Sequence, residues 1–322
     1  MPSIQSEVRF LPVAVKEAIR PEHVENAQSG DYITHVLEAA DVTVQDHDVI
    51  AISSKVAAFL DGGLVRLDDV APTRKARILG RLFHRDPRKI QLVLEEGKVS
   101  FVVPLGRIIH IPELQKMMAR RTGDPETMVA GYSINNAFTF IVKKHAAYLD
   151  EAGIDHTNSP EEYVCLLPED PCRLAREIRE GIRKHFGADV AVILTDTVSS
   201  VGRLGSQDVA IGYSGIDPIT RETFSPDLFG IPRAGGIDLI IDSLAGMAGL
   251  VMGQTIEKTP IVVIQGVNYQ PERADELPGM EAVSWPAGIE WKFALFTVLA
   301  TLRLWLGNLI SFQPRTKKSR IS

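Results

Sequence analysis

The sequence predicts a mixed fold between α/β and α+β, with mixed β-sheets flanked by helices. Short runs rich in Val, Ile and Phe alternate with segments of helical periodicity along most of the chain. The 322 residues are 45% hydrophobic and 24% charged, which provides ample apolar material for a core. The sequence shows no internal repeat and no low-complexity segment. These observations indicate a globular chain of one large domain or two smaller ones.

Eight runs are expected to be strands because β-branched and aromatic residues dominate them. In chain order they are residues 8–15, 47–54, 89–96, 99–105, 137–144, 189–196, 208–215 and 260–267. The segments with helical periodicity are residues 31–40, 72–84, 171–187 and 237–253. The third of these helices begins with a proline and ends at a glycine, as helix termini commonly do.

We expect residues 1–285 to form the body, as one domain or two subdomains, and residues 286–322 to form an apolar helix with a basic tail. The length of the apolar run approaches that of a membrane span, but Arg303 in its middle is costly in lipid. One interpretation is a helix packed on the body or on a second subunit. The other is a helix on a membrane surface, with Lys317, Lys318 and Arg320 near anionic lipid.

Charge and cysteine content exclude several classes of protein. The net charge of −6 and the pI near 5.8 give no basic surface for nucleic-acid binding. The two cysteines, Cys165 and Cys172, match no zinc or redox spacing and cannot form a disulfide framework. The first ten residues lack the basic and apolar regions of a secretion signal. We therefore expect a cytoplasmic protein without a nucleic-acid partner.

The stretch AVILTDTVSSVGRLGSQDVAIG, residues 191–212, places an acid at the mouth of a turn. Asp196 follows an apolar run and is expected at the carboxyl end of a buried strand, where α/β sheets commonly bind ligands. Its carboxylate can hold a hard cation and the hydroxyl of Thr197 can complete the shell, although capping is an equally good role. Arg203 lies between two glycines, which suits a phosphate or carboxylate ligand. The sequence contains no P-loop.

Two further segments place polar groups near expected element ends. Asp155 and Asn158 flank a short turn, where an Asx-turn or helix cap is the common role and metal or ligand binding is the alternative. Ser54 and Lys55 end the run that begins at residue 47, and a lysine there is commonly solvated but can also bind a phosphate oxygen.

A third segment, AGLVMGQTIEKTP, ends an apolar helix. Gly253 closes the helix and exposes Gln254, as expected for an ordinary glycine C-terminus. No one of these motifs is specific on its own.

Taken in order, these segments resemble the family of coenzyme F420-0:L-glutamate ligases. The matching blocks are GDYITHVLEAA with HDVIAISSKV, AGIDHTN, LLPEDP, TDT with the R.G and AIG that follow it, DLFG, and AGLVMG. They occur in the family's order between residues 8 and 267, and six ordered blocks are far more specific than one motif. The resemblance implies the deazaflavin gamma-glutamyl ligase-like fold.

The resemblance also implies an activity. Such ligases form an amide bond between L-glutamate and a coenzyme F420 precursor, and a related small acid is an alternative acceptor. They use GTP and a divalent cation, Mg²⁺ or Mn²⁺, to phosphorylate a substrate carboxylate, and the amine of glutamate then attacks the acyl phosphate. The cation neutralises charge on the transferring phosphoryl group while Lys and Arg hold the phosphates. The family further implies a homodimer with its active site near the subunit interface.

Site roles carry over from the family residue by residue. Asp155, Asp196 and Thr197 match metal ligands, and Gln254 occupies a position where the family usually has a metal-binding Glu. The positions that match nucleotide binding are Ser54, Lys55, Asn158 and Gly253. Lys55 and Arg203 are the expected contacts to phosphate or carboxylate during catalysis.

Several positions depart from the family. Gln254 exchanges a carboxylate for a neutral amide, which should weaken a second cation. Ser199 and Ser200 replace the usual Gly-Arg, Phe59 replaces a second Lys, and Glu151 replaces an Asn. Three alternatives follow: an active ligase of this kind, a non-catalytic relative that binds a ligand or partner, or an amide ligase with a different acceptor and a different nucleotide such as ATP.

Overall fold

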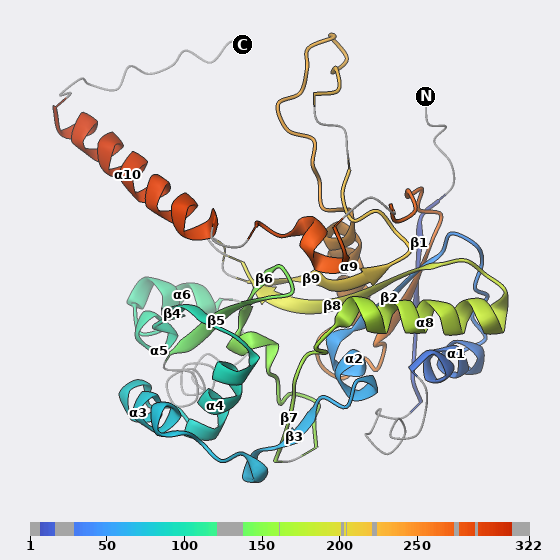
Figure 1. Cartoon of the computed structure of the whole chain (residues 1–322), viewed down its shortest axis with the longest axis horizontal. Helices are drawn as coiled ribbons and strands as arrows, with labels where there is room; N and C mark the ends of the chain where they lie inside the picture. The colour runs from blue at the N-terminus through green and yellow to red at the C-terminus, as the bar shows by residue number, and fades with distance from the viewer. Residues whose placement is uncertain are drawn as a thin grey trace. The chain divides into compact units, whose positions relative to one another are not determined.

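The computed structural model describes residues 7–16, 29–120, 138–160, 162–200, 203, 205–220, 224–273, 277–286 and 289–310. The chain divides into two compact units, Met1–Val283 and Ser284–Ser322 (Figure 1). Whether each unit folds as an independent domain stays a prediction. Both cysteines are free and buried.

A five-stranded mixed sheet forms the centre of the first unit. Its order is β1 (Arg9–Val13), β10 (Ile261–Gln265), β2 (Val49–Ser53), β8 (Ala191–Ser199) and β9 (Ser206–Ser214). Only the β2–β8 pair is parallel, and the other three pairs are antiparallel. This arrangement confirms the predicted mixed α/β class.

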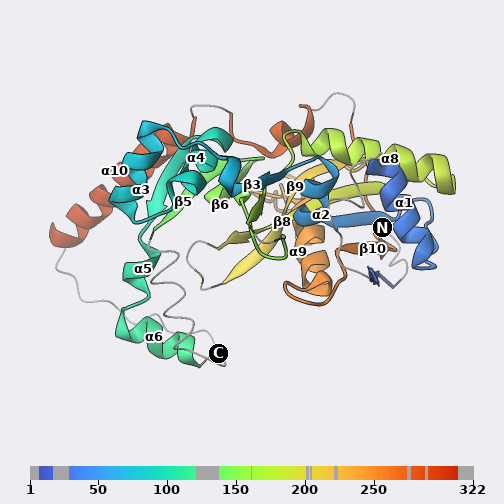
Figure 2. The same cartoon turned by 90° about the horizontal axis from the view of Figure 1, so that it is seen from below.

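Helices cover both faces of this sheet because side chains alternate along its buried strands. Ile50 of β2 and Leu194 of β8 face α1 (Ser29–Ala39) and α8 (Pro171–Phe186). Val49 and Ile193 face α9 (Ile240–Met252) on the opposite side. Figure 2 shows α9 below the sheet and α8 above it.

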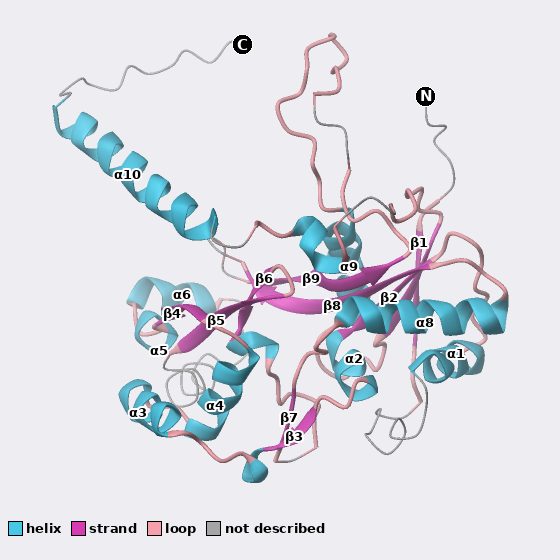
Figure 3. Ribbon diagram, viewed as in Figure 1, coloured by secondary structure: helices cyan, strands magenta, loops and turns pink. Residues whose placement is uncertain are grey.

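Two smaller sheets complete the first unit (Figure 3). One joins β3 (Leu64–Arg66) to β7 (Tyr163–Cys165), and the other has the order β4 (Val99–Val103), β5 (Thr139–Lys144), β6 (Ala147–Asp150). The remaining described α-helices of this unit are α2 (Ser54–Leu60), α3 (Arg74–Phe83), α4 (Pro87–Glu96), α5 (Leu105–Ile108) and α6 (Pro112–Ala119). Helices α3 and α4 pack with β5 in a separate apolar cluster.

The predicted strand at residues 89–96 is wrong, because these residues belong to helix α4. The carboxylate of Asp86 accepts a hydrogen bond from the backbone N–H of Arg88 at 2.8 Å, and Pro87 occupies the first turn. A short apolar run fits a buried strand and a buried helix equally well. The Asp-Pro pair before the run is the helix-start signal that decides between them.

The second unit contains α10 (Ile289–Ile310), which matches the predicted C-terminal helix. Among the described residues, no helix combines the length and the apolar character needed to cross a bilayer. The basic residues Lys317, Lys318 and Arg320 lie outside the described part of the chain.

Candidate active site

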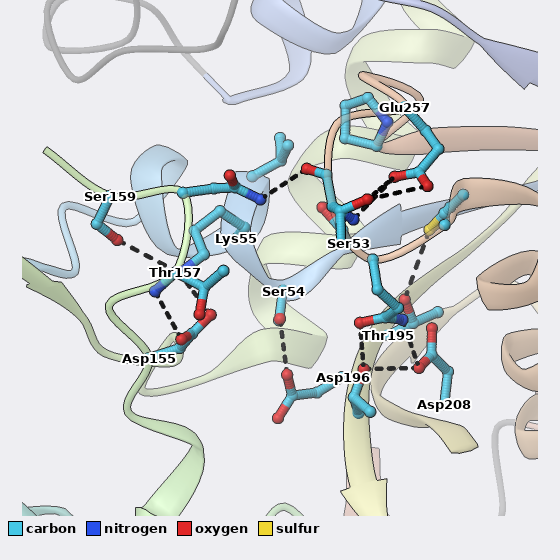
Figure 4. A pocket seen from close by; sticks show the side chains of 18 of the residues that line it. Ser53, Ser54, Lys55, Asp155, Thr157, Ser159, Thr195, Asp196, Asp208 and Glu257 are labelled. Atoms are coloured by element: carbon cyan, nitrogen blue, oxygen red, sulfur yellow. Dashed lines mark hydrogen bonds and ion pairs between the residues drawn. The ribbon is translucent and has the colours of Figure 1, made fainter. Parts of the chain in front are cut away.

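A cavity of about 1020 Å³ opens at one edge of the central sheet. Its lining consists of Val15 and of four stretches of sequence: residues 53–59, 150–160, 195–197 with 208, and 252–260 (Figure 4). Eight of the predicted site residues contribute to its wall, namely Ser54, Lys55, Asp155, Asn158, Asp196, Thr197, Gly253 and Gln254. Arg203 does not, because it lies exposed in the connection between β8 and β9.

Parallel pairing of β2 and β8 brings Ser54 and Asp196 together. Ser53 lies opposite Thr195 in the register, so α2 begins beside the carboxyl half of β8. The Ser54 hydroxyl donates to Asp196 Oδ1 at 2.7 Å. Asp196 thus lies within the carboxyl half of β8 and not at the strand end that was predicted, because β8 continues three residues beyond it, to Ser199.

The Asp196 carboxyl is strongly perturbed. Burial raises its pKa to about 6, against the opposing effect of hydrogen bonds from Ser54 and from the backbone of Thr197. The carboxylates of Asp208 and Asp155 raise the pKa further. A buried acid beside two other acids is therefore a place where a cation is electrostatically favoured.

Asp208 is a site residue that the sequence analysis missed. It lies opposite Thr197 in the β8–β9 hairpin and accepts a 2.7 Å hydrogen bond from the Thr197 hydroxyl. The Gln254 side-chain amide donates to the same Asp208 oxygen at 3.4 Å. Burial raises the pKa of Asp208 in spite of both hydrogen bonds. In the sequence, Asp208 is visible only as the single acid that opens the apolar run DVAIGYS. The hairpin register that places it opposite Thr197 comes from the structure.

Asp155 and Lys55 form an ion pair on the opposite wall. Lys55 Nζ lies 2.9 Å from Asp155 Oδ2 and also donates to the Ser159 hydroxyl at 3.4 Å. Asp155 Oδ1 accepts from the backbone N–H of Thr157 at 2.8 Å, which is the expected Asx-turn. Burial opposes ionisation, but Lys55 and Thr157 together hold the pKa of Asp155 below its usual value.

A left-handed turn delivers Asp155 to the cavity. Glu151, Ala152 and Gly153 have φ angles of 52°, 60° and 76°, a conformation that costs free energy in residues other than glycine. The Glu151 carboxylate accepts from Arg85 at 2.8 Å and from the backbone N–H of Phe140 at 2.9 Å, and Ala152 is fully buried. These contacts keep the strained turn in place.

The loop after α9 forms another part of the cavity wall. Gly253 has a φ of 73°, and an added Cβ would lie 2.4 Å from Glu257 Cδ. The Asn158 side-chain amide donates to the Thr255 carbonyl at 3.1 Å, which joins this loop to the segment bearing Asp155. Asn158 thus lines the cavity, and its described contact is to the protein backbone. Its role as a nucleotide contact stays a prediction.

The donor set fits a hard divalent cation. Asp196, Asp208, Thr197 and Gln254 offer oxygen atoms, which Mg²⁺ and Mn²⁺ prefer. Within the described ranges, no three acidic, histidine or cysteine side chains converge closely enough to hold a metal ion together. Neutral oxygens would therefore complete the coordination of any cation bound here.

The sequence profile described as F420-0:Gamma-glutamyl ligase matches residues 21–266. The chain belongs to this family. Membership makes it an enzyme that forms carbon–nitrogen bonds. The matched range contains every cavity-lining segment except Val15, and it ends before α10.

Individual relatives support the same assignment. The chain is similar to the coenzyme F420:L-glutamate ligase of Methanopyrus kandleri, with 32% identity over 266 residues that cover 83% of this chain and 90% of the relative. The enzyme of the same name from Methanosarcina mazei is 30% identical over 80% of this chain and 88% of its own length. The one from Methanocaldococcus jannaschii is 30% identical over 71% and 79%, respectively.

Proposed function

We propose that this F420-0:gamma-glutamyl ligase family member is a metal-dependent, GTP-using γ-glutamyl ligase. It joins L-glutamate to a coenzyme F420 precursor, or to a related small acid, through an acyl phosphate. The observation that carries the proposal is the convergence of Asp155, Asp196 and Lys55 on one cavity inside the family match. We place this activity in the cytoplasm.

The described residues divide the work of phosphoryl transfer. A bound Mg²⁺ or Mn²⁺ supplies charge neutralisation to the transferring phosphoryl group. Asp196 and Asp208 would hold that cation, and Thr197 and Gln254 would contribute neutral oxygens. Lys55 is held in the cavity by Asp155 and presents its ammonium group to a phosphate oxygen.

The overall reaction has two transfers. An oxygen of the acceptor carboxylate forms a bond to the γ-phosphorus of GTP, and the bond from that phosphorus to GDP breaks. The amine nitrogen of glutamate then forms the amide bond with the acyl carbon, inorganic phosphate leaves, and the amine loses a proton. Both steps gain from the exclusion of water, because water would hydrolyse the acyl phosphate.

The direct test is an assay with purified protein, GTP, Mg²⁺, L-glutamate and the deazaflavin precursor. We expect phosphate release together with a product heavier by one glutamate residue, and loss of both in Asp196→Asn. A family ligase of known activity serves as the positive control. Absence of turnover with this acceptor and with related acids, while the control works, would contradict the proposal.

Gln254 favours a second candidate, a relative that keeps the cavity but binds a ligand without turnover. Its amide donates to Asp208, where a glutamate would instead add a negative charge. Gln254→Glu separates the two functions. If the protein is an enzyme whose activity Gln254 weakens, this variant should gain both Mn²⁺ affinity and turnover. If it is a binding protein, the variant should gain Mn²⁺ affinity alone. Replacing GTP by ATP in the same assay tests the third alternative, a ligase with another nucleotide.

A homodimer is the proposed assembly, and residues 224–239 are the surface that we assign to it. This long loop, orange in Figure 1, exposes Phe224, Leu228, Phe229 and Ile231. The Asp227 carboxylate accepts from the backbone N–H groups of Phe229 and Ile231, which form the turn at the tip of the loop. Leu228→Ser with Phe229→Ser should convert a dimer into a monomer in analytical ultracentrifugation. An unchanged mass would contradict this surface.

A further inference from the structure

Helix α3 exposes a surface that combines unpaired cations with aliphatic side chains. We call it the α3 patch, and it consists of Arg74, Lys75, Arg77, Ile78, Arg81 and Leu82. Ile78 is 53% exposed and Leu82 is 64% exposed. Ala76 and Gly80 on the opposite face of α3 are buried, so that face packs against the rest of the unit and the patch faces solvent.

The cations of the α3 patch differ from Arg85 and Arg88, which follow α3 in the sequence. Arg85 pairs with Glu151, and Arg88 pairs with Asp86 and Asp68. Among the described residues, none of the four cations in the patch forms an ion pair. Arg77 and Arg81 are four residues apart on one helix face, where like charges repel. The fold therefore holds a cluster of positive charge that no described internal partner neutralises.

The excess of positive charge is confined to the region of the α3 patch, because the first unit as a whole is acidic. Residues 1–283 contain 29 Lys and Arg against 40 Asp and Glu. Residues 72–98 reverse this balance, with eight basic residues against three acidic ones. The pattern indicates a partner that carries negative charge and approaches this one surface.

The second unit also combines an excess of positive charge with exposed apolar side chains. Residues 284–322 contain six basic residues and one acid. Its helix α10 exposes apolar side chains that include Phe296, Leu302 and Trp305. Both regions thus combine exposed apolar groups with an excess of positive charge, and the second lies outside the range matched by the family profile.

We propose that the α3 patch binds the surface of an anionic lipid bilayer, with the second unit as an additional contact of the same kind. A bilayer surface accommodates cations at its headgroups and aliphatic side chains just beneath them. A nucleic-acid backbone would use the cations but would leave Ile78 and Leu82 exposed to water. The two aliphatic residues therefore favour lipid.

The test is flotation of the full-length protein with vesicles. Vesicles of phosphatidylcholine with phosphatidylglycerol should carry the protein upward, and vesicles of phosphatidylcholine alone should not. Arg77→Ser with Arg81→Ser should lower the partition coefficient about 25-fold, since each cation contributes about fivefold at an anionic surface. Ile78→Ser with Leu82→Ser should also lower it, which a purely ionic contact would not show.

The matched control is Arg183→Ser with Lys184→Ser, which removes two exposed cations from the last turn of α8 and changes the net charge equally. This variant should partition as the unmodified protein does. The proposal would be overturned if the Arg183/Lys184 control lost as much vesicle binding as the Arg77/Arg81 variant does. Absence of flotation of the unmodified protein would overturn it as well. So would retention of single-stranded RNA by the α3 patch without flotation. Ligase turnover without vesicles should be the same in all variants, which separates this proposal from the proposed function.

Discussion

Gly153→Ala offers a quantitative test of the left-handed turn that positions Asp155. Gly153 has a φ of +76°, and a Cβ built on it would lie 2.3 Å from Leu167 Cδ1 and 2.8 Å from Leu167 Cγ. Leu167 is buried in the main core cluster, so it has little room to move aside. The same Cβ would lie 3.3 Å from Asp196 Oδ2, which brings the perturbation to the cavity itself.

The expected loss of stability has two parts. A residue with a Cβ costs about 1–2 kcal/mol at such a φ. Forcing a methyl group into a packed core costs about 1–3 kcal/mol more. We therefore expect Gly153→Ala to lower the free energy of unfolding by about 2–5 kcal/mol in total.

Gly187→Ala is the matched control, because Gly187 has a φ of +71° and no atom within 4 Å of its added Cβ. It should show the backbone cost alone, about 1–2 kcal/mol. Urea unfolding followed by circular dichroism measures both variants against the unmodified protein. If the two variants lost equal stability, the close packing of Gly153 against Leu167 would be refuted.

Three further outcomes follow from the same geometry. Burial raises the pKa of Asp196 from the ordinary aspartate value of 3.8 to about 6, which favours the neutral form in the folded state. The stability that this group contributes is therefore full below pH 3.8 and is lost as pH rises through about 6. Asp196→Asn should remove this dependence in urea unfolding across that range. Arg85→Met should cost about 3 kcal/mol in the same measurement, because it leaves the Glu151 carboxylate buried without its partner. Lys55→Met should raise the pKa of Asp155, which carbon-13 NMR titration of that carboxyl would show, and an unchanged titration would contradict the ion pair.

The central sheet and most of the cavity could be predicted from sequence for one physical reason. Buried strands are short apolar runs, and polar residues at their ends have few places to go except the edge of the sheet. Asp196 follows such a run, and Ser54 follows another. The parallel pairing of these two runs then brings the residues within 2.7 Å of each other.

The remaining features depend on contacts that no local pattern encodes. The strands β3 and β7 have three residues each, too few to show an alternation. The left-handed turn places Glu151 and Ala152 at positive φ, which their residue types do not signal, because Arg85 and the core hold them there. Arg203 was expected at the phosphate, but the β8–β9 hairpin carries it beyond the cavity wall.

The charge of the cavity is the strongest physical argument for a cation in the proposed reaction. Five acidic side chains and two lysines line it, and Lys55 is already paired with Asp155. A nucleoside triphosphate would bring further negative charge into this cavity. Phe59 adds no positive charge to offset it at the position where the resemblance implies a lysine. A divalent cation held by Asp196 and Asp208 would change this repulsion into attraction for the phosphates. Gln254 offers a neutral amide where the resemblance implies a carboxylate, so the protein alone attracts the cation less strongly than a site with that carboxylate would. We therefore expect the cation to need the phosphates of the nucleotide for tight binding, and the nucleotide to need the cation.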